Sequence, residues 1–262
     1  MLRFLLIAIL LFTTISLSAQ PYEINLSSKQ ANALGQLIWE NEGQQKLQHL
    51  TSWNRGEDFP SLGLGHFIWY PNKEKGPFKE QFPALLTYFK KHGVTPPAWL
   101  SDLKFAPWKS REQFYTEFDD EALSQLRVFL SEHIDLQVKF VILRLENAIP
   151  LIIADCNKQQ KKRVIANLSQ LTSTTQGLFA LLDYINFKGD GLSKLERYQG
   201  DGWGLKQVLL TMPEVYQDPL RIFGLAADEV LTRRVKNAPR DEFRWLKGWR
   251  VRIHAYQDIK IR

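Results

Sequence analysis

Two short segments of the sequence place a glutamate ahead of a glycine-rich, β-like stretch. Glu42 precedes Gly43 at the expected end of a helix, and Ser-Leu-Gly-Leu-Gly-His follows at residues 61–66. Cleavage of a glycosidic bond needs a carboxylic acid whose pKa is raised by half-apolar surroundings, so that it can protonate the leaving oxygen. A second carboxylate or a positioned water acts across the sugar ring. A helix-end glutamate that faces a glycine-rich hairpin can supply this arrangement. Glu40 and Glu42 lie on opposite flanks of the apolar stripe of the helix, so position does not separate them, and the following Gly43 favours Glu42 as the general acid.

The second catalytic group is expected in the residues between this glutamate and the strand. Glu57 and Asp58 follow Glu42 by fifteen and sixteen positions, and Asp58 is preferred because it lies nearer the strand. Ser61 carries a hydroxyl that can position a water or bond to the acid. A mechanism with a single acid stays open, and so does a plain solvated turn at residues 55–58.

Residues suited to sugar binding flank this segment and a second glycine-rich segment at 183–207. Aromatic rings offer flat apolar faces, and glycines let a ligand approach the backbone. Glu196, in the second segment, is the rival for the role of catalytic acid. The predicted substrate-binding residues are Trp53, Asn54, Gly63, Gly65, His66, Trp69, Tyr70, Asn186, Tyr198 and Gln207.

Glu42-Gly43 with the later Ser-Leu-Gly-Leu-Gly-His resembles phage-type lysozymes, whose pattern is Glu-Gly, a spacer and Thr-Ile-Gly-x-Gly-His. Gly-Trp-Gly-Leu-Lys-Gln at 202–207 is similar to the Gly-Leu-Met-Gln signature of lytic transglycosylases, from the same lysozyme-like superfamily. The resemblance implies a lysozyme-like glycoside hydrolase that cleaves β-1,4 bonds of peptidoglycan. Thr51 stands where phage-type lysozymes carry an aspartate, which leaves the second catalytic group undecided.

Two other functions stay open beside a muramidase. The first is a related enzyme, either a lytic transglycosylase or a chitinase- or chitosanase-like hydrolase. The second is a non-catalytic envelope protein that binds the cell wall. In each case the expected partner is peptidoglycan or a related β-1,4-linked amino-sugar polymer, bound by a monomer without a cofactor. The five histidines are scattered and show no metal-ligand spacing, so no metal site is expected.

The first nineteen residues predict a secretory signal peptide, with Arg3, an apolar run over 4–17 and a small residue at Ala19. The run is shorter than the ~20 residues of a spanning helix, so we expect a secreted or periplasmic protein without a membrane span after cleavage. Cys156 is the single cysteine, which excludes an intramolecular disulfide. The net charge of +6 fits an anionic polymer, and no nucleic-acid module is evident.

Apolar residues at helical spacing predict a mainly α (α+β) single domain over 20–262. Its expected form is a lysozyme-like helical body and a small β-hairpin lobe with a glycan-binding cleft between them. The pattern over 119–147 is one long helix or a broken pair, with Pro150 just beyond it. A hairpin is expected over 59–70 and a loop over 189–204. The other expected helices cover 28–42, 79–91, 158–171, 173–185, 204–211, 219–236 and the basic, aromatic tail 241–255.

Overall fold

The computed structural model describes residues 23–24, 28–43, 46–73, 76, 78–214 and 216–259. The predicted signal peptide lies outside these residues. The helices are α1 (Ser28–Gly43), α2 (Phe82–Lys91), α3 (Arg111–Thr116), α4 (Glu121–Glu132), α5 (Ile134–Ala154), α6 (Lys158–Thr172), α7 (Thr175–Lys188), α8 (Leu205–Thr211), α9 (Pro219–Asn237) and α10 (Phe243–His254). Short 3₁₀ turns are η1 (Leu47–Leu50), η2 (Ala98–Leu100) and η3 (Ala255–Asp258). The strands are β1 (Thr51–Ser52), β2 (Ser61–Leu62), β3 (Phe67–Ile68), β4 (Arg197–Tyr198) and β5 (Asp201–Gly202).

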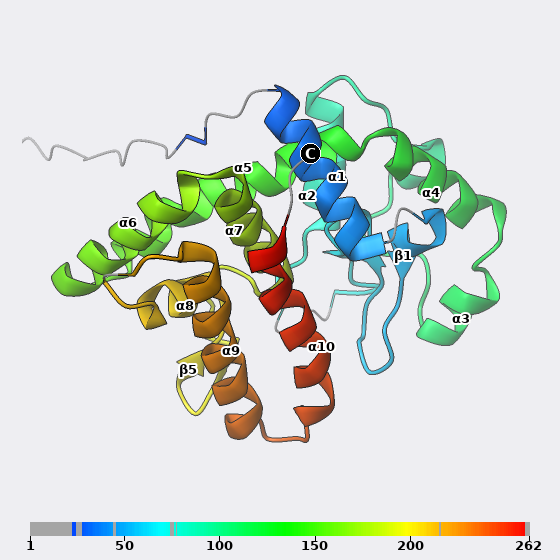
Figure 1. Ribbon diagram of the computed structural model, residues 1–262. Coiled ribbons are helices and arrows are strands. Elements are labelled where there is room, and N and C mark those ends of the chain that lie inside the picture. The colour runs from blue at the N-terminus through cyan, green and yellow to red at the C-terminus, as the bar shows by residue number, and fades with distance from the viewer. Residues whose placement is uncertain are drawn as a thin grey trace, which may run out of the picture.

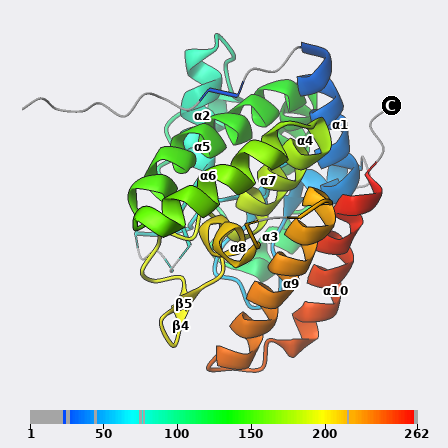
Figure 2. The same cartoon turned by 60° about the vertical axis from the view of Figure 1, so that its left-hand side comes forward.

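The described chain is mainly helical and carries two small antiparallel sheets, β1-β2-β3 and β4-β5. In Figure 1 the first sheet lies on the same side as α3 and α4, whereas α6, α8 and α9 lie on the other side. Figure 2 shows α9 and α10 side by side, joined by a short connection at the bottom of the view. The mainly α class with a small β element is therefore confirmed.

The broken-pair alternative for residues 119–147 is the one observed. His133, with φ −124° and ψ 37°, separates α4 from α5. The expected end of the second helix before Pro150 was wrong, because α5 continues to Ala154 with Pro150 inside it. Proline removes one helical hydrogen bond. Ile149 and Ile152 beside it are both fully buried, and their packing offsets that cost.

The predicted hairpin forms from β2 and β3, and β1 adds a third strand. Ser61 pairs with Ile68 and Leu62 with Phe67 in antiparallel register. The turn between them needs left-handed backbone at Gly63, with φ 75°, and at His66, with φ 47°. A non-glycine residue in this conformation is uncommon, so the turn that carries His66 is held in place by the surrounding structure.

Gln137 of α5 attaches this turn to the helical body. Its side chain is fully buried, and its Oε1 accepts the backbone N–H of Leu64 at 2.8 Å. Its Nε2 donates to the carbonyls of Leu130 at 2.7 Å and His133 at 3.2 Å. One amide therefore joins the hairpin turn to the corner between α4 and α5.

The C-terminal helix is held against α7 by a buried carboxylate. Asp183 of α7 is 1% exposed and accepts two hydrogen bonds from Arg252, at 2.8 and 2.7 Å. The Tyr256 hydroxyl donates a third at 2.5 Å. A buried carboxylate is stable only when such donors satisfy it, so α10 and η3 are placed firmly beside the end of α7.

The segment expected as a loop over 189–204 contains the β4-β5 hairpin and is closed by Gln207. The Gln207 Nε2 donates to the Gly191 carbonyl at 3.1 Å, and its Oε1 accepts the Gly204 N–H at 3.0 Å. Gly191 has φ 83°, and a Cβ there would overlap the Gln207 Oε1. Gln207 thus fixes the start of α8 to this segment.

Every helix among the described residues is too short or too polar to cross a bilayer.

Replacing Gln137 with Met keeps the side-chain length but leaves the Leu64 N–H unpaired in the core, whereas the Leu130 carbonyl still accepts the His133 N–H. We expect the free energy of unfolding to fall by about 1–3 kcal/mol, the cost of one buried unpaired polar group. Urea denaturation measures this. The same change at the exposed Gln125 of α4 is the control and should shift stability by less than about 0.5 kcal/mol. Equal effects at both positions would contradict the anchoring role.

Candidate functional site

The hairpin turn meets the end of α7 at Asn186. A Cβ on Gly65 would lie 2.9 Å from the Asn186 Oδ1, so only a glycine lets the two segments approach this closely. The same Oδ1 accepts a hydrogen bond from Arg144 Nη1 of α5 at 3.1 Å. Burial lowers the pKa of Arg144 to about 10, and Asp190 opposes that shift. The sheet β1-β2-β3 with its turns, which we call the β lobe, is therefore joined to the helical body through polar groups at this point.

Ionisable side chains from both lobes gather around Lys188, the last residue of α7. We call the set Glu57, His66, Lys188, Asp190 and Glu196 the Lys188 cluster. The charge of Lys188 acts on both Glu57 and Glu196, and the charge of His66 acts on Glu57. All five side chains are half-buried. The cluster joins residues that lie more than a hundred positions apart in the sequence.

Glu57 contributes one carboxylate from the loop between β1 and β2. Burial raises its pKa above the ordinary value. The hydrogen bond from Asn54 Nδ2, at 3.2 Å, and the charges of His66 and Lys188 oppose this shift. The Trp53 indole N–H donates to the Glu57 carbonyl at 2.7 Å, which holds the loop in place. Asn54 therefore contacts the carboxylate itself.

Glu196 contributes the second carboxylate, from the segment between α7 and β4. Burial and the nearby negative charge of Asp190 raise its pKa to about 7, against the opposing charges of Arg234 and Lys188. A carboxyl group with this pKa is substantially protonated at neutral pH. Such a group can donate a proton where an ordinary glutamate cannot.

Lys188 lies over two aromatic rings. Its Nζ is 3.6 Å from the centroid of Trp249 and 4.0 Å from that of Phe187. Burial lowers its pKa well below the ordinary value, and the charges of Arg234 and Arg252 add to the shift. The carboxylates Glu242 and Glu57 oppose it. An amine in this position binds acceptors strongly, because its surroundings only partly replace the lost water.

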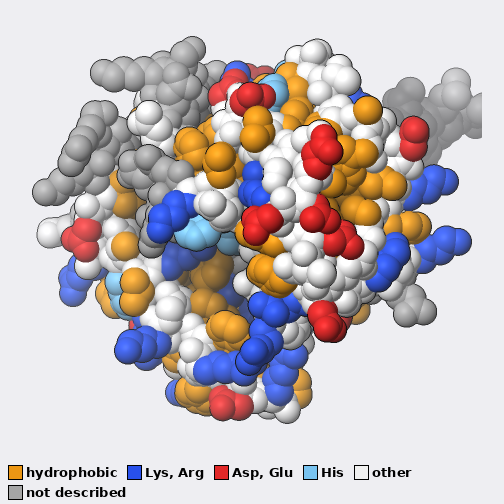
Figure 3. Space-filling view, turned by 90° about the vertical axis from the view of Figure 1, so that its right-hand side faces the viewer, with side chains coloured by type: hydrophobic (Ala, Val, Ile, Leu, Met, Phe, Trp, Pro, Cys, Tyr) orange, Lys and Arg blue, Asp and Glu red, His pale blue; other side chains and the backbone are white. Residues whose placement is uncertain are grey.

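Figure 3 shows the side of the molecule that carries the first sheet in Figure 1. This face has a hollow, and Lys, Arg and His side chains gather around its border. Hydrophobic side chains lie deeper within it. A hollow of this kind can admit a polar ligand that carries negative charge.

The three other predicted catalytic residues are not members of the Lys188 cluster. Glu42 lies in the last turn of α1, and its side chain is outside the described residues. Asp58 is exposed. Ser61 is 5% exposed within β2. Of the predicted catalytic residues with a described side chain, Glu57 is the one in the Lys188 cluster.

The aromatic residues predicted to bind sugar near the hairpin lie in the core. Trp53, Trp69 and Tyr70 are 2%, 0% and 1% exposed, so their rings offer no open face to a ligand. Trp69 packs on Phe82 with ring centroids 5.0 Å apart. The Tyr70 hydroxyl donates to the Phe78 carbonyl at 3.1 Å, and burial raises its pKa to about 12.

The remaining predicted binding residues divide between the two lobes. Tyr198 donates its hydroxyl to Glu242 Oε1 at 2.9 Å, and Gln207 bonds to the glycine segment as described above. A Cβ on Gly63 would lie 2.5 Å from the Gln137 Oε1. Gly63 is therefore packed against protein atoms and leaves no space for a ligand beside its backbone. His66 and Asn186 lie at the junction of the lobes.

Sequence reasoning did not predict Lys188 or Arg144 as members of a site, and it noted Trp249 only as part of the basic, aromatic tail 241–255. Lys188 belongs to the segment 183–191, which was recognised as rich in polar groups. Its neighbours come from β1-β2, α9 and α10, and no local pattern indicates which distant segments will meet. The raised pKa of Glu196 depends on the same long-range packing.

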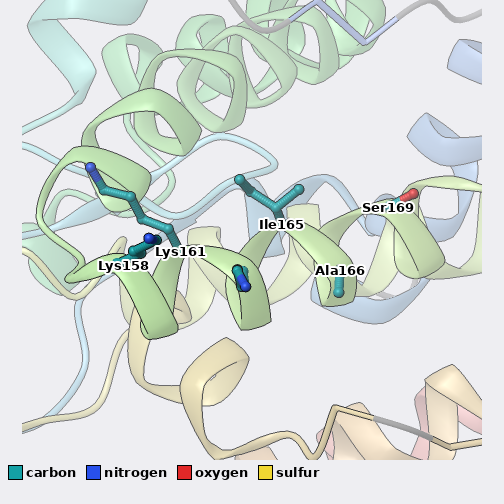
Figure 4. A pocket seen from close by; sticks show the side chains of 6 residues that line it. Lys158, Lys161, Ile165, Ala166 and Ser169 are labelled. Carbon is teal, nitrogen blue, oxygen red and sulfur yellow. The ribbon is translucent and has the colours of Figure 1, made fainter.

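A separate open depression of about 760 Å³ lies along α6. Figure 4 shows that its labelled side chains all come from this one helix. The lining residues are Lys158, Lys161, Lys162, Ile165, Ala166 and Ser169. One helix surface offers no facing wall, so we do not place the site there. Within the described residues, no group of three or more His, Cys, Asp or Glu side chains is placed to hold a metal ion.

Comparison of the chain with protein-family models, with curated proteins and with solved structures found no match.

Replacing Gly65 with Ala tests the junction between the lobes. The new Cβ would lie 2.6 Å from the Phe67 ring of the same hairpin and 2.9 Å from the Asn186 Oδ1 of α7, so both side chains must shift. We expect a loss of about 1–3 kcal/mol in the free energy of unfolding, as for other overpacked sites. Thermal unfolding measures it.

Gly248 of α10 is the matched control, because a Cβ there meets no atom within 4 Å. Alanine at this helical position should stabilise the protein by about 0.5–1 kcal/mol. A neutral or stabilising Gly65→Ala would show that the lobes are not in close contact.

Proposed function

We propose that this protein is a glycosidase that cleaves the β-1,4 bonds of peptidoglycan. The single observation that carries the proposal is the Lys188 cluster, in which Glu57 and Glu196 both have raised pKa values at the junction of a β lobe and a helical body. Glycosidases need one protonated and one ionised carboxyl group beside the bond. The similarity of the two glycine-rich segments to lysozyme-like enzymes supports the same chemistry.

Glu196 is the proposed proton donor. Its carboxyl proton passes to the glycosidic oxygen as the bond from that oxygen to the anomeric carbon breaks. Water then adds to the anomeric carbon, and its proton returns to a carboxylate. The charges of His66 and Lys188 favour the ionised form of Glu57, which suits stabilisation of the positive transition state or activation of the water. Glu42, the donor predicted from the sequence, is the alternative.

The positive charge of the protein favours an acidic glycan as the substrate. The chain has a net charge of +6, and Lys, Arg and His side chains gather around the border of the hollow in Figure 3. Peptidoglycan carries carboxylates on its muramic acid and peptides, whereas chitosan is cationic. Like charges repel, so chitosan cleavage is the less favoured alternative.

Digestion of purified peptidoglycan, with products identified by mass spectrometry, tests the proposal. The protein should release reducing-end muropeptides, and Glu196→Gln should slow this by about 10²- to 10⁴-fold, the usual contribution of a general acid. Glu57→Gln should also slow it. Glu132→Gln, at the exposed end of α4, is the matched control and should leave the rate unchanged.

Three other outcomes of the digestion would change the proposed function. Full activity in Glu196→Gln together with loss in Glu42→Gln would move the proton donor to Glu42. Anhydro ends would indicate attack by the muramic acid hydroxyl, the transglycosylase reaction. Binding to peptidoglycan without any product, in every variant, would contradict an enzyme and favour a wall-binding protein.

The pH dependence of cleavage follows from the pKa of Glu196. The donor must be protonated, so activity should fall as the pH rises through about 7. Asp190→Asn removes a negative charge that raises this pKa, so the alkaline fall should move to lower pH. Asp135→Asn, on the exposed surface of α5, is the control. An unchanged profile in Asp190→Asn would contradict Glu196 as the donor.

A further inference from the structure

We infer that Trp245 and Trp249 of α10 form an aromatic platform that stacks on sugar rings of the polysaccharide beyond the Lys188 cluster. The inference rests on the proposed function and extends it, because it adds a binding surface on a helix that supplies none of the proposed catalytic carboxylates. The ligand class is an acidic amino-sugar polymer of several units.

Trp249 connects this platform to the cluster. Its ring centroid is 3.6 Å from the Lys188 Nζ and 6.4 Å from the Phe187 ring, which it meets edge to face. Arg234 lies 5.0 Å from the same centroid. The ring is half-buried, so part of it belongs to the wall of the site and part is open.

Trp245 extends the same face of α10 outward. Residues four apart on a helix are neighbours on one face, so Trp245 lies next to Trp249, one turn toward the start of the helix. Its side chain is 43% exposed. A large open ring beside a polar site offers what sugar stacking requires, a flat apolar surface that a ligand can cover.

Positive charge accompanies both rings. Arg244 lies 4.8 Å from the Trp245 centroid, and Lys188 and Arg234 lie over Trp249. An indole face flanked by cations favours a ligand along which apolar ring faces alternate with carboxylates. A chain of acidic amino sugars has this alternation, and its charge complements the platform.

Phe243 provides a control within the same helix. It is 56% exposed, but two residues along a helix correspond to about 200° of rotation, so it points away from the Trp245 face. A ligand that stacks on the platform should not contact it, whereas a flat, nonspecific hydrophobic attachment would use both.

The test measures binding of the inactive Glu196→Gln protein to insoluble peptidoglycan by pelleting. Adding Trp245→Ala should weaken binding about three- to tenfold, the range for one aromatic contact. Adding Phe243→Ala should leave binding unchanged, and Trp245→Phe should restore most of it. With Glu196 intact, Trp245→Ala should raise KM for long glycan strands and leave that for a tetrasaccharide unchanged.

Unchanged binding in Trp245→Ala would overturn the inference, and so would equal losses in Trp245→Ala and Phe243→Ala. Binding to vesicles of phosphatidylglycerol can be measured in the same way. If Trp245→Ala weakened binding to these vesicles but left binding to peptidoglycan unchanged, the inference would also be overturned. The proposed function fails separately, if the protein with Glu196 releases no products. A Trp245-dependent loss of wall binding in that case would support the platform and reject the catalysis.

Discussion

The contact between the hairpin turn and the end of α7 is the constraint on which the site depends. Gln137 holds one side of the turn through the hydrogen bond from the Leu64 N–H, and two further bonds, to the Leu130 and His133 carbonyls, fix its side chain within the helical body. Gly65 leaves room for Asn186 on the other side, and Arg144 holds the Asn186 amide. These groups are all at least partly buried, so each has to be satisfied for the lobes to close. Closure in turn brings Glu57 within reach of the charge on Lys188.

Burial at this junction changes the chemistry of ordinary side chains. Glu57 and Glu196 are common surface residue types, and both acquire raised pKa values because water is removed from around them. The two differ in their surroundings, because the negative charge of Asp190 raises the pKa of Glu196 further. Two carboxylates in different surroundings can then act as acid and base at one pH. The buried pair of Asp183 and Arg252 supports this arrangement by holding α10 against α7.

Local patterns in the sequence predicted the helices and the hairpin well, but not which of these elements contact one another. The apolar periodicity gave helices close to the observed α1, α2, α6, α7, α8, α9 and α10, and the glycine-flanked pattern gave the β2-β3 hairpin. Pro150 misled because packing of Ile149 and Ile152 outweighs the loss of one helical hydrogen bond. Periodicity also indicates which face a tryptophan occupies but not what covers it. Trp69, which was predicted to bind sugar, is a core residue, whereas Trp245, which was not among the predicted binding residues, is exposed. Lys188 has no local signal, since Glu57, Arg234 and Trp249 beside it come from distant segments.

The most direct measurement of the central claim is the pKa of Glu196 in the folded protein. Nuclear magnetic resonance of protein labelled with ¹³C at the glutamate carboxyl carbon follows each titration, and the signal missing from Glu196→Gln identifies this residue. If Glu196 is the proton donor, its midpoint should lie near 7. A midpoint near the ordinary glutamate value of about 4.3 would contradict it, because Glu196 would then be ionised at neutral pH and unable to serve as the proton donor.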